Sequence, residues 1–341
     1  MIFLIFIFLF FLLIYEYNSK QKINFIYIYI GIILILFSGL RYMYGLDYNS
    51  YKGLYFSTNP SFSSIEFLFS KFMLVIKSLS NQNYYIFIFI NAFIAILTKI
   101  FFIKKNTRYF FLSIFIYFTV IFLVYDLGLL RQSLAMGIIS IGFLFDEKDK
   151  NISFIFYVIA VFVHITSIII LFVFLFYKII PKFHYNNCLI IILLILAYLI
   201  GNFILPIYIN DIMNKLINSE YLLWKINFYL NNYPNTGISL NLIRGFFIIF
   251  LILNSNIKNK FTIYYILGLI IYSFFSFNVQ FATRFFSYFL ILETIIVPKI
   301  LSIRKDKNLV FVILIVLYSI SFFNNVIIFD LYDYHSILGG I

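Results

Sequence analysis

Charged residues are scarce in this sequence: they make up 11% of its 341 residues, whereas 64% of the residues are hydrophobic. Soluble domains carry about 25% charged residues, so this balance excludes water as the main solvent of the fold. The single cysteine, Cys188, excludes an intramolecular disulfide and a thiolate metal cluster. The Walker loop, H-E-x-x-H, G-x-S-x-G and the dinucleotide fingerprint are also missing. The composition therefore predicts an integral membrane protein.

Long apolar runs follow one another along the chain and predict transmembrane helices. A hydrocarbon core about 30 Å thick needs about 17 to 25 apolar residues per helix. The run 188–197 is apolar on every face, which excludes a barrel with polar lumen positions. We predict helices at 2–15, 24–40, 84–103, 109–124, 128–145, 152–180, 188–205, 241–255, 261–277, 285–300 and 309–329. The fold class is therefore all-α: a polytopic membrane protein with about eleven or twelve transmembrane helices, forming one domain over 1–341.

Basic residues set the predicted orientation. The net charge is +12, and membrane proteins concentrate lysine and arginine in their cytoplasmic loops. In this context the charge indicates orientation, and we expect no nucleic-acid partner. If the run 152–180 turns back at His164, most of the basic residues lie on the same side of the membrane. They are Lys20, Lys22, Lys99, Lys104, Lys105, Arg108, Lys148, Lys150, Lys178, Lys182, Lys258, Lys260, Lys299, Arg304, Lys305 and Lys307. We assign that side to the cytoplasm and predict a hairpin at His164, with both termini outside.

Two long segments then face outward, 41–83 and 206–240. Within the first, apolar residues recur at helical spacing over 62–79 beside charged ones, which predicts a helix lying in the membrane interface. The second is rich in Asn and Tyr and resembles a loop that caps an external cavity.

Four arginines stand at predicted outer helix ends, where the orientation rule does not expect them: Arg41, Arg131, Arg244 and Arg284. Arginine offers a rigid fork of donors that matches phosphate oxygens, so the group predicts an anionic, phosphate-bearing ligand. The alternative is that each arginine reaches singly to lipid headgroups or pairs with a nearby carboxylate such as Asp47, Glu66, Asp126 or Asp211.

Two residues are candidate general bases. Asp47 lies in the phenol-rich segment 41–51 directly after a predicted helix, and its alternative role is an ion pair with Arg41. His164 lies inside an apolar run at the predicted outer turn, and its alternative role is structural. In the same phenol-rich segment, Tyr48 and Tyr51 belong either to an aromatic belt or to a platform that stacks on sugars.

The order of several motifs resembles the EpsG family of polysaccharide polymerases, related in role to the Wzy repeat-unit polymerases. The matching pieces are the segment 39–51 (Gly-Leu-Arg-Tyr-Met-Tyr-Gly-Leu-Asp-Tyr-Asn-Ser-Tyr), Glu66 at a helix start, 130–135 (Leu-Arg-Gln-Ser-Leu-Ala), 162–167 (Phe-Val-His-Ile-Thr-Ser) and Arg284 before an aromatic run. The resemblance implies metal-independent glycosyl transfer without a cofactor, at the outer face of the bacterial cytoplasmic membrane. It also implies a glycan donor and acceptor, each linked to undecaprenyl diphosphate, with Glu66 and Gln132 among the glycan contacts.

Both lines of argument lead to one hypothesis. The four arginines hold the diphosphate of a polyprenyl-linked chain, and His164 or Asp47 deprotonates the acceptor hydroxyl. Membrane lipids, a chain-length regulator and a flippase are the further partners expected. The rival hypotheses are a flippase for the same lipid-linked sugar and a membrane O-acyltransferase. Transporters often show repeats and broken helices with midplane charges, whereas this sequence has no visible repeat and its charges lie at predicted helix ends, which favours the enzyme. An O-acyltransferase would need a histidine within an acyl-donor site, for which His164 is the candidate.

Overall fold

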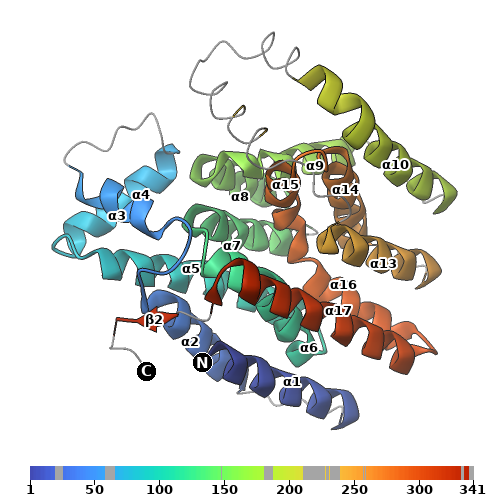
Figure 1. The fold of residues 1–341 in the computed structure, drawn as a ribbon, viewed down its shortest axis with the longest axis horizontal. Helices are drawn as coiled ribbons and strands as arrows, with labels where there is room; N and C mark the ends of the chain where they lie inside the picture. Colours follow the sequence, from blue (N-terminus) through green and yellow to red (C-terminus); the bar gives the residue numbers. More distant parts are fainter. Residues whose placement is uncertain are drawn as a thin grey trace. The chain divides into compact units, whose positions relative to one another are not determined.

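The computed structural model describes residues 1–19, 26–57, 66–146, 148–179, 187–209, 227, 230, 239–255, 257, 259–331 and 334–337. These residues are almost all helical, which confirms the predicted all-α class. Figure 1 shows the helices coloured along the sequence. The contacts between the described residues divide the chain into two compact units. The first unit comprises Met1–Phe174 and Glu293–Ile341, and the second comprises Leu175–Leu292. The single-domain assignment stays a prediction.

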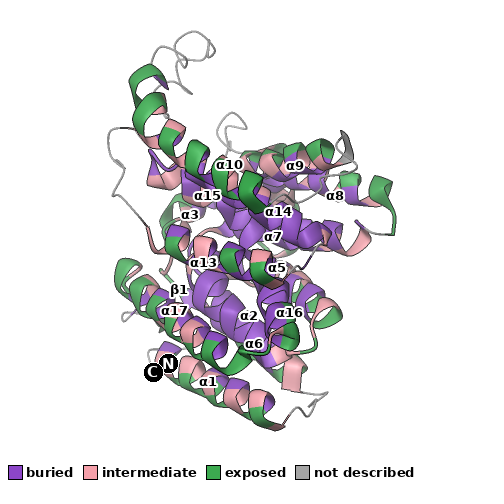
Figure 2. Cartoon of the chain, turned by 90° about the vertical axis from the view of Figure 1, so that its right-hand side faces the viewer, coloured by how far each residue is buried: buried purple, intermediate pink, exposed green. Residues whose placement is uncertain are grey.

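The first unit contains most of the helices. They are α1 (Ile2–Ser19), α2 (Ile26–Gly39), α3 (Tyr48–Phe56), α4 (Phe67–Leu79), α5 (Tyr84–Asn106), α6 (Phe110–Ile116) with its π-helical continuation (Tyr117–Asp126), α7 (Leu130–Phe145), α8 (Lys150–Val163), α16 (Glu293–Ile303) and α17 (Lys307–Ile328). A 3-10 turn (Ile165–Ser167) leads into α9 (Ile168–Ile179), which crosses the boundary between the units. Figure 2 shows that α7 is buried along most of its length.

The second unit is built on α14 (Lys260–Phe274), which packs against the other helices of the unit. These are α10 (Asn187–Leu199) with a π-helical turn (Ile200–Ile204), α13 (Leu240–Ser255) and α15 (Val279–Leu290). Gly201 allows the π-helical turn to approach α14 closely, because a Cβ at that position would lie 2.3 Å from the carbonyl oxygen of Phe274.

Among the described residues, four helices have the length and apolar composition of a membrane span: α1, α5, the helix Asn187–Ile209 and α17. The pair α15 and α16 passes the same test together and counts as a fifth, and the other apolar helices have 10–17 residues. The count of about eleven or twelve spans stays a prediction.

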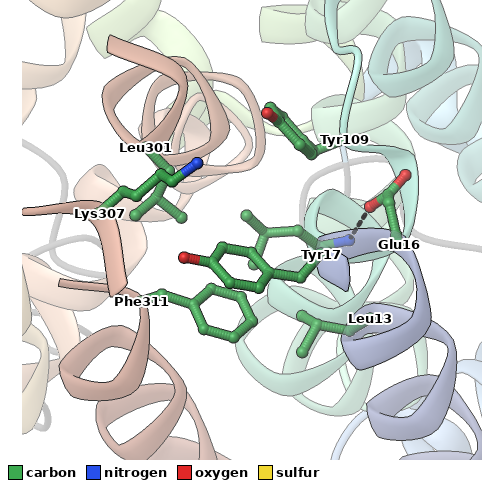
Figure 3. Close-up of a pocket in the computed structure, with 8 residues that line it drawn as sticks. Leu13, Glu16, Tyr17, Tyr109, Leu301, Lys307 and Phe311 are labelled. Atoms are coloured by element: carbon green, nitrogen blue, oxygen red, sulfur yellow. Dashed lines mark hydrogen bonds between the residues drawn. The ribbon is translucent and has the colours of Figure 1, made fainter. Parts of the chain in front are cut away.

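Polar side chains fix where several helices begin. Asn83, Asp149 and Asn278 each precede a helix and accept hydrogen bonds from backbone N–H groups of its first turn. The start of α6 is capped from a distance, since Oε2 of Glu16 on α1 accepts the N–H groups of Phe111 at 3.0 Å and Leu112 at 3.1 Å. Figure 3 shows the Glu16 carboxylate with one of these two contacts. This cap ties the end of α1 to the start of α6.

The predicted hairpin at His164 is confirmed. In one continuous helix the 17 steps from Tyr157 to Phe174 would separate these residues by about 25 Å at about 1.5 Å per residue. The rings of Tyr157 and Phe174 instead meet edge to face at 5.3 Å. His164 ends α8 in an extended conformation, φ −152° and ψ 114°, and the chain folds back through the 3-10 turn.

Helix directions place both termini at one end of the first unit. Phe3 packs on Phe322 at 5.6 Å, and Tyr17 stacks on Phe311 at 3.8 Å, so α1 and α17 are antiparallel. The chain returns to this end in a two-residue strand, β2 (His335–Ser336), which pairs antiparallel with β1 (Arg41–Tyr42) after α2. The termini therefore share one end, as predicted, and the assignment of that end to the outside stays a prediction.

In the first unit, helix ends that carry lysines lie together at one end, as predicted. Helices α5 and α7 run parallel, because Asn91 donates to the carbonyl of Leu130 at one end and the rings of Phe102 and Phe143 lie 5.8 Å apart towards the other. The lysines that end α5 and those that join α7 to α8 therefore share the end opposite Leu130. One assignment was wrong: Lys99 does not belong to this cytoplasmic set, because it lies fully buried inside α5.

Three further predictions need correction or limits. The run 285–300 is not one helix, since the chain breaks after Leu290 and restarts at Glu293, whose buried carboxylate accepts a hydrogen bond from Tyr318 at 3.0 Å. The helix predicted over 62–79 begins at Phe67, with residues 62–65 outside the described part. Most of the predicted capping loop 206–240, including 210–226 and 231–238, also lies outside the described residues.

Candidate functional site

Three predicted site residues meet at the carboxylate of Glu66, which precedes α4. Oε2 accepts a hydrogen bond from Nη1 of Arg131, and the two side chains form an ion pair. Oε1 accepts from Nδ1 of His164 and from the backbone N–H of Ile165, both at 3.0 Å. Because an ionised carboxylate only accepts, the His164 proton in this contact sits on Nδ1. Arg131, Glu66 and His164 therefore form one linked cluster, which we call the Glu66 cluster.

Local structure explains why these distant residues meet. Arg131 is the second residue of α7, and His164 directly follows α8. The two helices pack antiparallel, as the contact of Ser153 Oγ with the carbonyl of Gly142 at 3.0 Å shows, so the start of α7 lies beside the end of α8. Helix α4 packs on α8, and its first residue is preceded by Glu66. Three helix ends thus supply the cluster.

Tyr51 and Asp47, from α3 and the residue before it, lie beside the cluster. The ring centroid of Tyr51 is 5.3 Å from Cζ of Arg131, which is the geometry of a cation–π contact. Asp47 is close enough to Arg131 and Tyr51 to interact with both electrostatically. The segment 41–51 therefore contributes an acid and a ring to the site.

Burial and charge fix the ionisation of Glu66. Its side chain is 15% exposed, against 21% for Arg131 and 9% for His164. Burial alone would raise the pKa of the Glu66 carboxyl, but the hydrogen bond from His164, the charges of Arg131 and His164, and the Ile165 N–H together hold that pKa below its usual range. The site thus combines a fixed carboxylate, an oriented imidazole and a guanidinium whose Nε is buried without a hydrogen-bond partner among the described residues.

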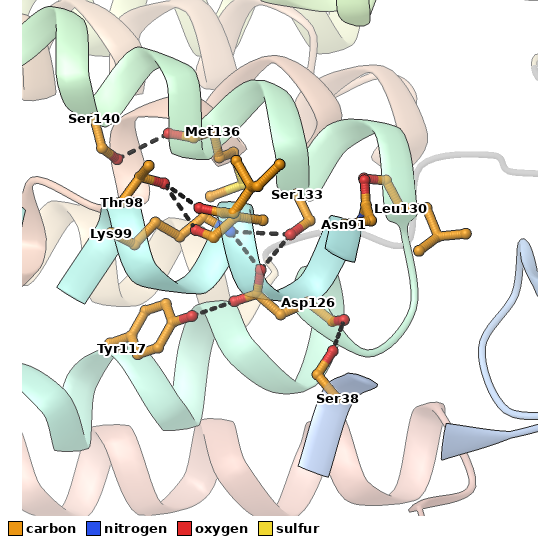
Figure 4. A network of polar contacts seen from close by, with 12 residues as sticks. Ser38, Asn91, Thr98, Lys99, Tyr117, Asp126, Leu130, Ser133, Met136 and Ser140 are labelled. Atoms are coloured by element: carbon orange, nitrogen blue, oxygen red, sulfur yellow. Dashed lines mark hydrogen bonds and ion pairs between the residues drawn. The ribbon is translucent and has the colours of Figure 1, made fainter. Parts of the chain in front are cut away.

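A second polar cluster lies in the interior of the same unit, around Asp126 at the end of the π-helical segment (Figure 4). Its carboxylate pairs with Lys99 of α5 and accepts from the hydroxyls of Tyr117 and Ser133. Lys99 also donates to Ser133 Oγ at 3.1 Å, and the side chains of Lys99 and Asp126 are fully buried. Ser133 lies two positions after Arg131, so this cluster anchors the first turn of α7.

Arg41 joins that interior cluster and lies 1% exposed. Its Nη1 donates to the carbonyl of Asp126 at 2.7 Å and to the hydroxyl and carbonyl of Ser38 at 2.9 and 3.2 Å. In this structure the Arg41 guanidinium therefore holds backbone carbonyls together and offers little surface to a ligand. Its predicted role in binding a diphosphate would require the segment around β1 to open.

The predicted glycan contacts are more buried than sugar stacking needs. Tyr48 is 1% exposed, with its ring edge to face with Tyr84 at 5.4 Å, and Tyr84 donates to the Tyr48 carbonyl. Tyr51 is 3% exposed and packs on Phe69. Gln132 is 3% exposed on α7. Glu66 carries the cluster described above, so its position matches the site but its partners are protein groups.

Arg244 and Arg284 belong to the second unit. Arg244, on α13, is 1% exposed and lies close enough to Tyr272 of α14 to interact electrostatically. Tyr272 in turn shares a hydrogen bond of 2.5 Å with Ser239. Arg284 is half-buried on α15. A joint diphosphate site of these two residues with Arg131 stays a prediction.

The sequence contained a signal for the Asp126 cluster that helix prediction overlooked. Lys99 stands inside the apolar run 84–103, where an ionisable residue usually faces the protein interior and has a partner. Its side chain was instead assigned to the nearby cytoplasmic lysines. Among the described residues, no group of three or more His, Cys, Asp or Glu side chains is placed to hold a metal ion.

The sequence model of the EpsG family matches residues 24–336, which is nearly the whole chain. No curated protein and no solved structure matches the chain significantly. The matched range contains the Glu66 cluster, the Asp126 cluster and both arginines of the second unit. Together with its apolar helices, this match shows that the chain is a multi-pass membrane protein of the EpsG family, a family of Wzy-type polysaccharide polymerases.

Proposed function

We propose that this chain joins polyprenyl-diphosphate-linked oligosaccharide repeat units by glycosyl transfer at the outer face of the bacterial cytoplasmic membrane. The observation that carries the proposal is the double contact of Glu66, which holds a guanidinium on one carboxylate oxygen and an imidazole on the other. These are the two groups that transfer from a diphosphate requires: one stabilises a leaving anion, and the other accepts a proton.

Arg131 is proposed to bind the diphosphate of the donor. The bond between the anomeric carbon and the diphosphate oxygen breaks with its electron pair, so negative charge develops on the leaving oxygen. The ion pair with Glu66 fixes the direction of the Arg131 guanidinium. Nε is buried and has no hydrogen-bond partner among the described residues, so it can donate to a phosphate oxygen once the side chains that cover it move. Tyr51 packs against the guanidinium and restricts its rotamers.

His164 is proposed as the general base. Its Nδ1 is held by Glu66, so Nε2 is the nitrogen that would take the proton of the acceptor hydroxyl as the hydroxyl oxygen attacks the anomeric carbon. Glu66 then stabilises the imidazolium that forms, as a carboxylate does beside a catalytic histidine in other enzymes. Asp47 stays the second candidate base, because it lies close enough to Arg131 to interact with it electrostatically.

The other predicted binding residues and partners are also part of the proposal. Arg244 and Arg284 are proposed as further diphosphate contacts, and membrane lipids, a chain-length regulator and a flippase as partners. The family match supports a polysaccharide-polymerase role over the flippase and O-acyltransferase alternatives.

A deletion strain tests the reaction class. Loss of a polymerase leaves surface glycan as single repeat units with no long chains, whereas loss of a flippase removes all surface glycan. Complementation with wild-type protein should restore long chains, and complementation with Arg131→Ala should not. Arg304→Ala is the matched control, because Arg304 pairs with Asp306 at a distant, solvent-exposed helix end. Long chains from Arg131→Ala at normal protein level would refute the proposed site.

A further inference from the structure

An open apolar groove of about 500 Å³ runs between α2 and α5 in the first unit. This volume lies within the range of known small-molecule sites. The groove is lined by aliphatic and aromatic side chains along most of its length and by two consecutive lysines, Lys104 and Lys105, at one end. Its polar end therefore coincides with the last turn of α5.

The length of the groove matches one leaflet of a bilayer. It follows α5 from Phe93 to Lys104, which is 11 steps or about 17 Å at about 1.5 Å per residue. Half of a hydrocarbon core about 30 Å thick is about 15 Å. The groove thus has room for the acyl chain of a lipid from a single leaflet, and is too short for an extended polyprenyl chain of many isoprene units.

Gly31 gives the groove its depth. A Cβ at this position would lie 3.4 Å from Cδ1 of Ile100, so any larger side chain on α2 would project into the space above α5. Ile32, the next residue, lines the rim and is 48% exposed. An apolar chain lying there would cover side chains that the protein itself leaves open.

The two lysines supply the complementary charge for an anionic headgroup. Both are exposed, and neither forms an ion pair with a described residue. Nζ of Lys104 lies 3.2 Å from the ring centroid of Tyr27, which holds the amine over the end of the groove. A phosphate at this position would meet two ammonium groups at the end of the apolar groove.

We propose that this groove is a binding site for an anionic phospholipid, with one acyl chain between α2 and α5 and the phosphate on Lys104 and Lys105. The lysine end of the groove lies at the end of the first unit opposite Leu130 and Arg131, and none of the residues that line the groove belongs to the Glu66 cluster. The site is therefore separate from the proposed glycosyl-transfer site, and its test does not depend on that activity.

Native mass spectrometry of the full-length purified protein tests the site. The protein is titrated with phosphatidylglycerol or phosphatidylcholine carrying identical acyl chains, and the occupancy of the first bound lipid is measured. Wild-type protein should bind phosphatidylglycerol preferentially. Replacing both lysines, Lys104→Gln with Lys105→Gln, should reduce that preference roughly tenfold. The control is Lys148→Gln with Lys150→Gln, which removes two exposed lysines from the same end of the unit and should keep the preference.

A second pair of variants tests the groove itself. Ile32→Trp should fill the groove from its exposed rim and lower the binding of both lipids, whereas Leu36→Trp, an exposed position one turn along α2 that does not line the groove, should not. Equal losses from both lysine pairs would show only a general effect of surface charge and would overturn the proposal. Wild-type binding by Ile32→Trp, or displacement of phosphatidylglycerol by an equal amount of undecaprenyl phosphate, would overturn it as well.

Discussion

Glu66 and His164 lie 98 positions apart in the sequence, and a hydrogen bond of 3.0 Å joins Oε1 of Glu66 to Nδ1 of His164. Because the second oxygen of the same carboxylate pairs with Arg131, the orientation of the imidazole and that of the guanidinium depend on one residue. Glu66, for which the family resemblance implied a glycan contact, is therefore the positioning group of the proposed site.

Glu66→Gln should lower chain extension by on the order of 10³-fold. The amide can donate to Nδ1 and so favours the wrong tautomer of His164, as replacement of the acidic triad residue does in serine proteases. The measurement is the rate of polymer formation by membranes that contain equal amounts of protein. Asp306→Asn is the control, because it makes the same chemical change at an exposed carboxylate paired with Arg304. Equal rates for Glu66→Gln and wild type would contradict the assigned role.

Arg131→Lys should also fail to support long chains, although the charge is kept. A lysine lacks the planar fork that can bind Glu66 and a phosphate oxygen together, and loss of one such donor costs about 10²-fold in rate. The distribution of glycan lengths on a gel provides the readout. The same change at Arg304 should leave the distribution unaltered.

The Glu66 cluster should make stability depend on pH in one direction. The pKa of Glu66 is lowered by folding, so its ion pair contributes fully above the ordinary carboxyl pKa of about 4.3 and is lost as the pH falls below that value. The comparison is made below pH 5, so that the titration of histidine, whose ordinary pKa is about 6.5, does not contribute. In this range wild-type protein should lose its Tm advantage over Glu66→Gln as the pH falls. A difference that grows on acidification would show that the sign is wrong.

The buried pair of Lys99 and Asp126 should be strongly coupled. Lys99→Met alone or Asp126→Leu alone leaves an unpaired buried charge, which typically costs about 3 to 5 kcal/mol. The double variant removes both charges and should recover most of that loss. Unfolding free energies measured in mixed micelles provide the test, with Lys105→Met as an exposed lysine control. Additive losses in the double variant would mean that the two residues do not act as a pair.

Cysteine labelling tests the orientation of the first unit. In a Cys188→Ser background, Met43→Cys lies at the end that carries the Glu66 cluster and is 54% exposed. A membrane-impermeant thiol reagent should label it in intact cells. Lys148→Cys, at the lysine-rich end, should react only after the membrane is made permeable. The reverse pattern would place the proposed site in the cytoplasm.

The helical framework was largely predictable because its signal is local. Apolar runs bounded by charged breaks located helices such as α5 and α17 to within a few residues. The hairpin at His164 followed from charge, since only a turn there kept the lysines on one side. The break between Leu290 and Glu293 was not predictable from the local sequence. The buried Glu293 carboxylate has its partner, Tyr318, on another helix 25 positions away.

The site was predictable in its members but not in its contacts. Sequence patterns selected Arg131, Glu66 and His164, yet nothing local indicates that Glu66 binds the other two. Arg41 shows the opposite outcome: its position at a helix end suggested a ligand contact, whereas tertiary packing buries it against the carbonyl of Asp126. Burial of a long polar side chain depends on tertiary contacts. Arg41 lies in β1, which pairs with β2 across almost the entire chain, and its guanidinium contacts Ser38 and Asp126.

Purified protein in nanodiscs, supplied with a synthetic polyprenyl-diphosphate-linked repeat unit, tests the Glu66 cluster as the centre of glycosyl transfer. Wild-type protein should produce a ladder of longer glycans and release one polyprenyl diphosphate for each bond formed, whereas folded His164→Gln protein should produce neither. A ladder of equal yield from His164→Gln, or the absence of any product from the wild-type protein, would contradict the account.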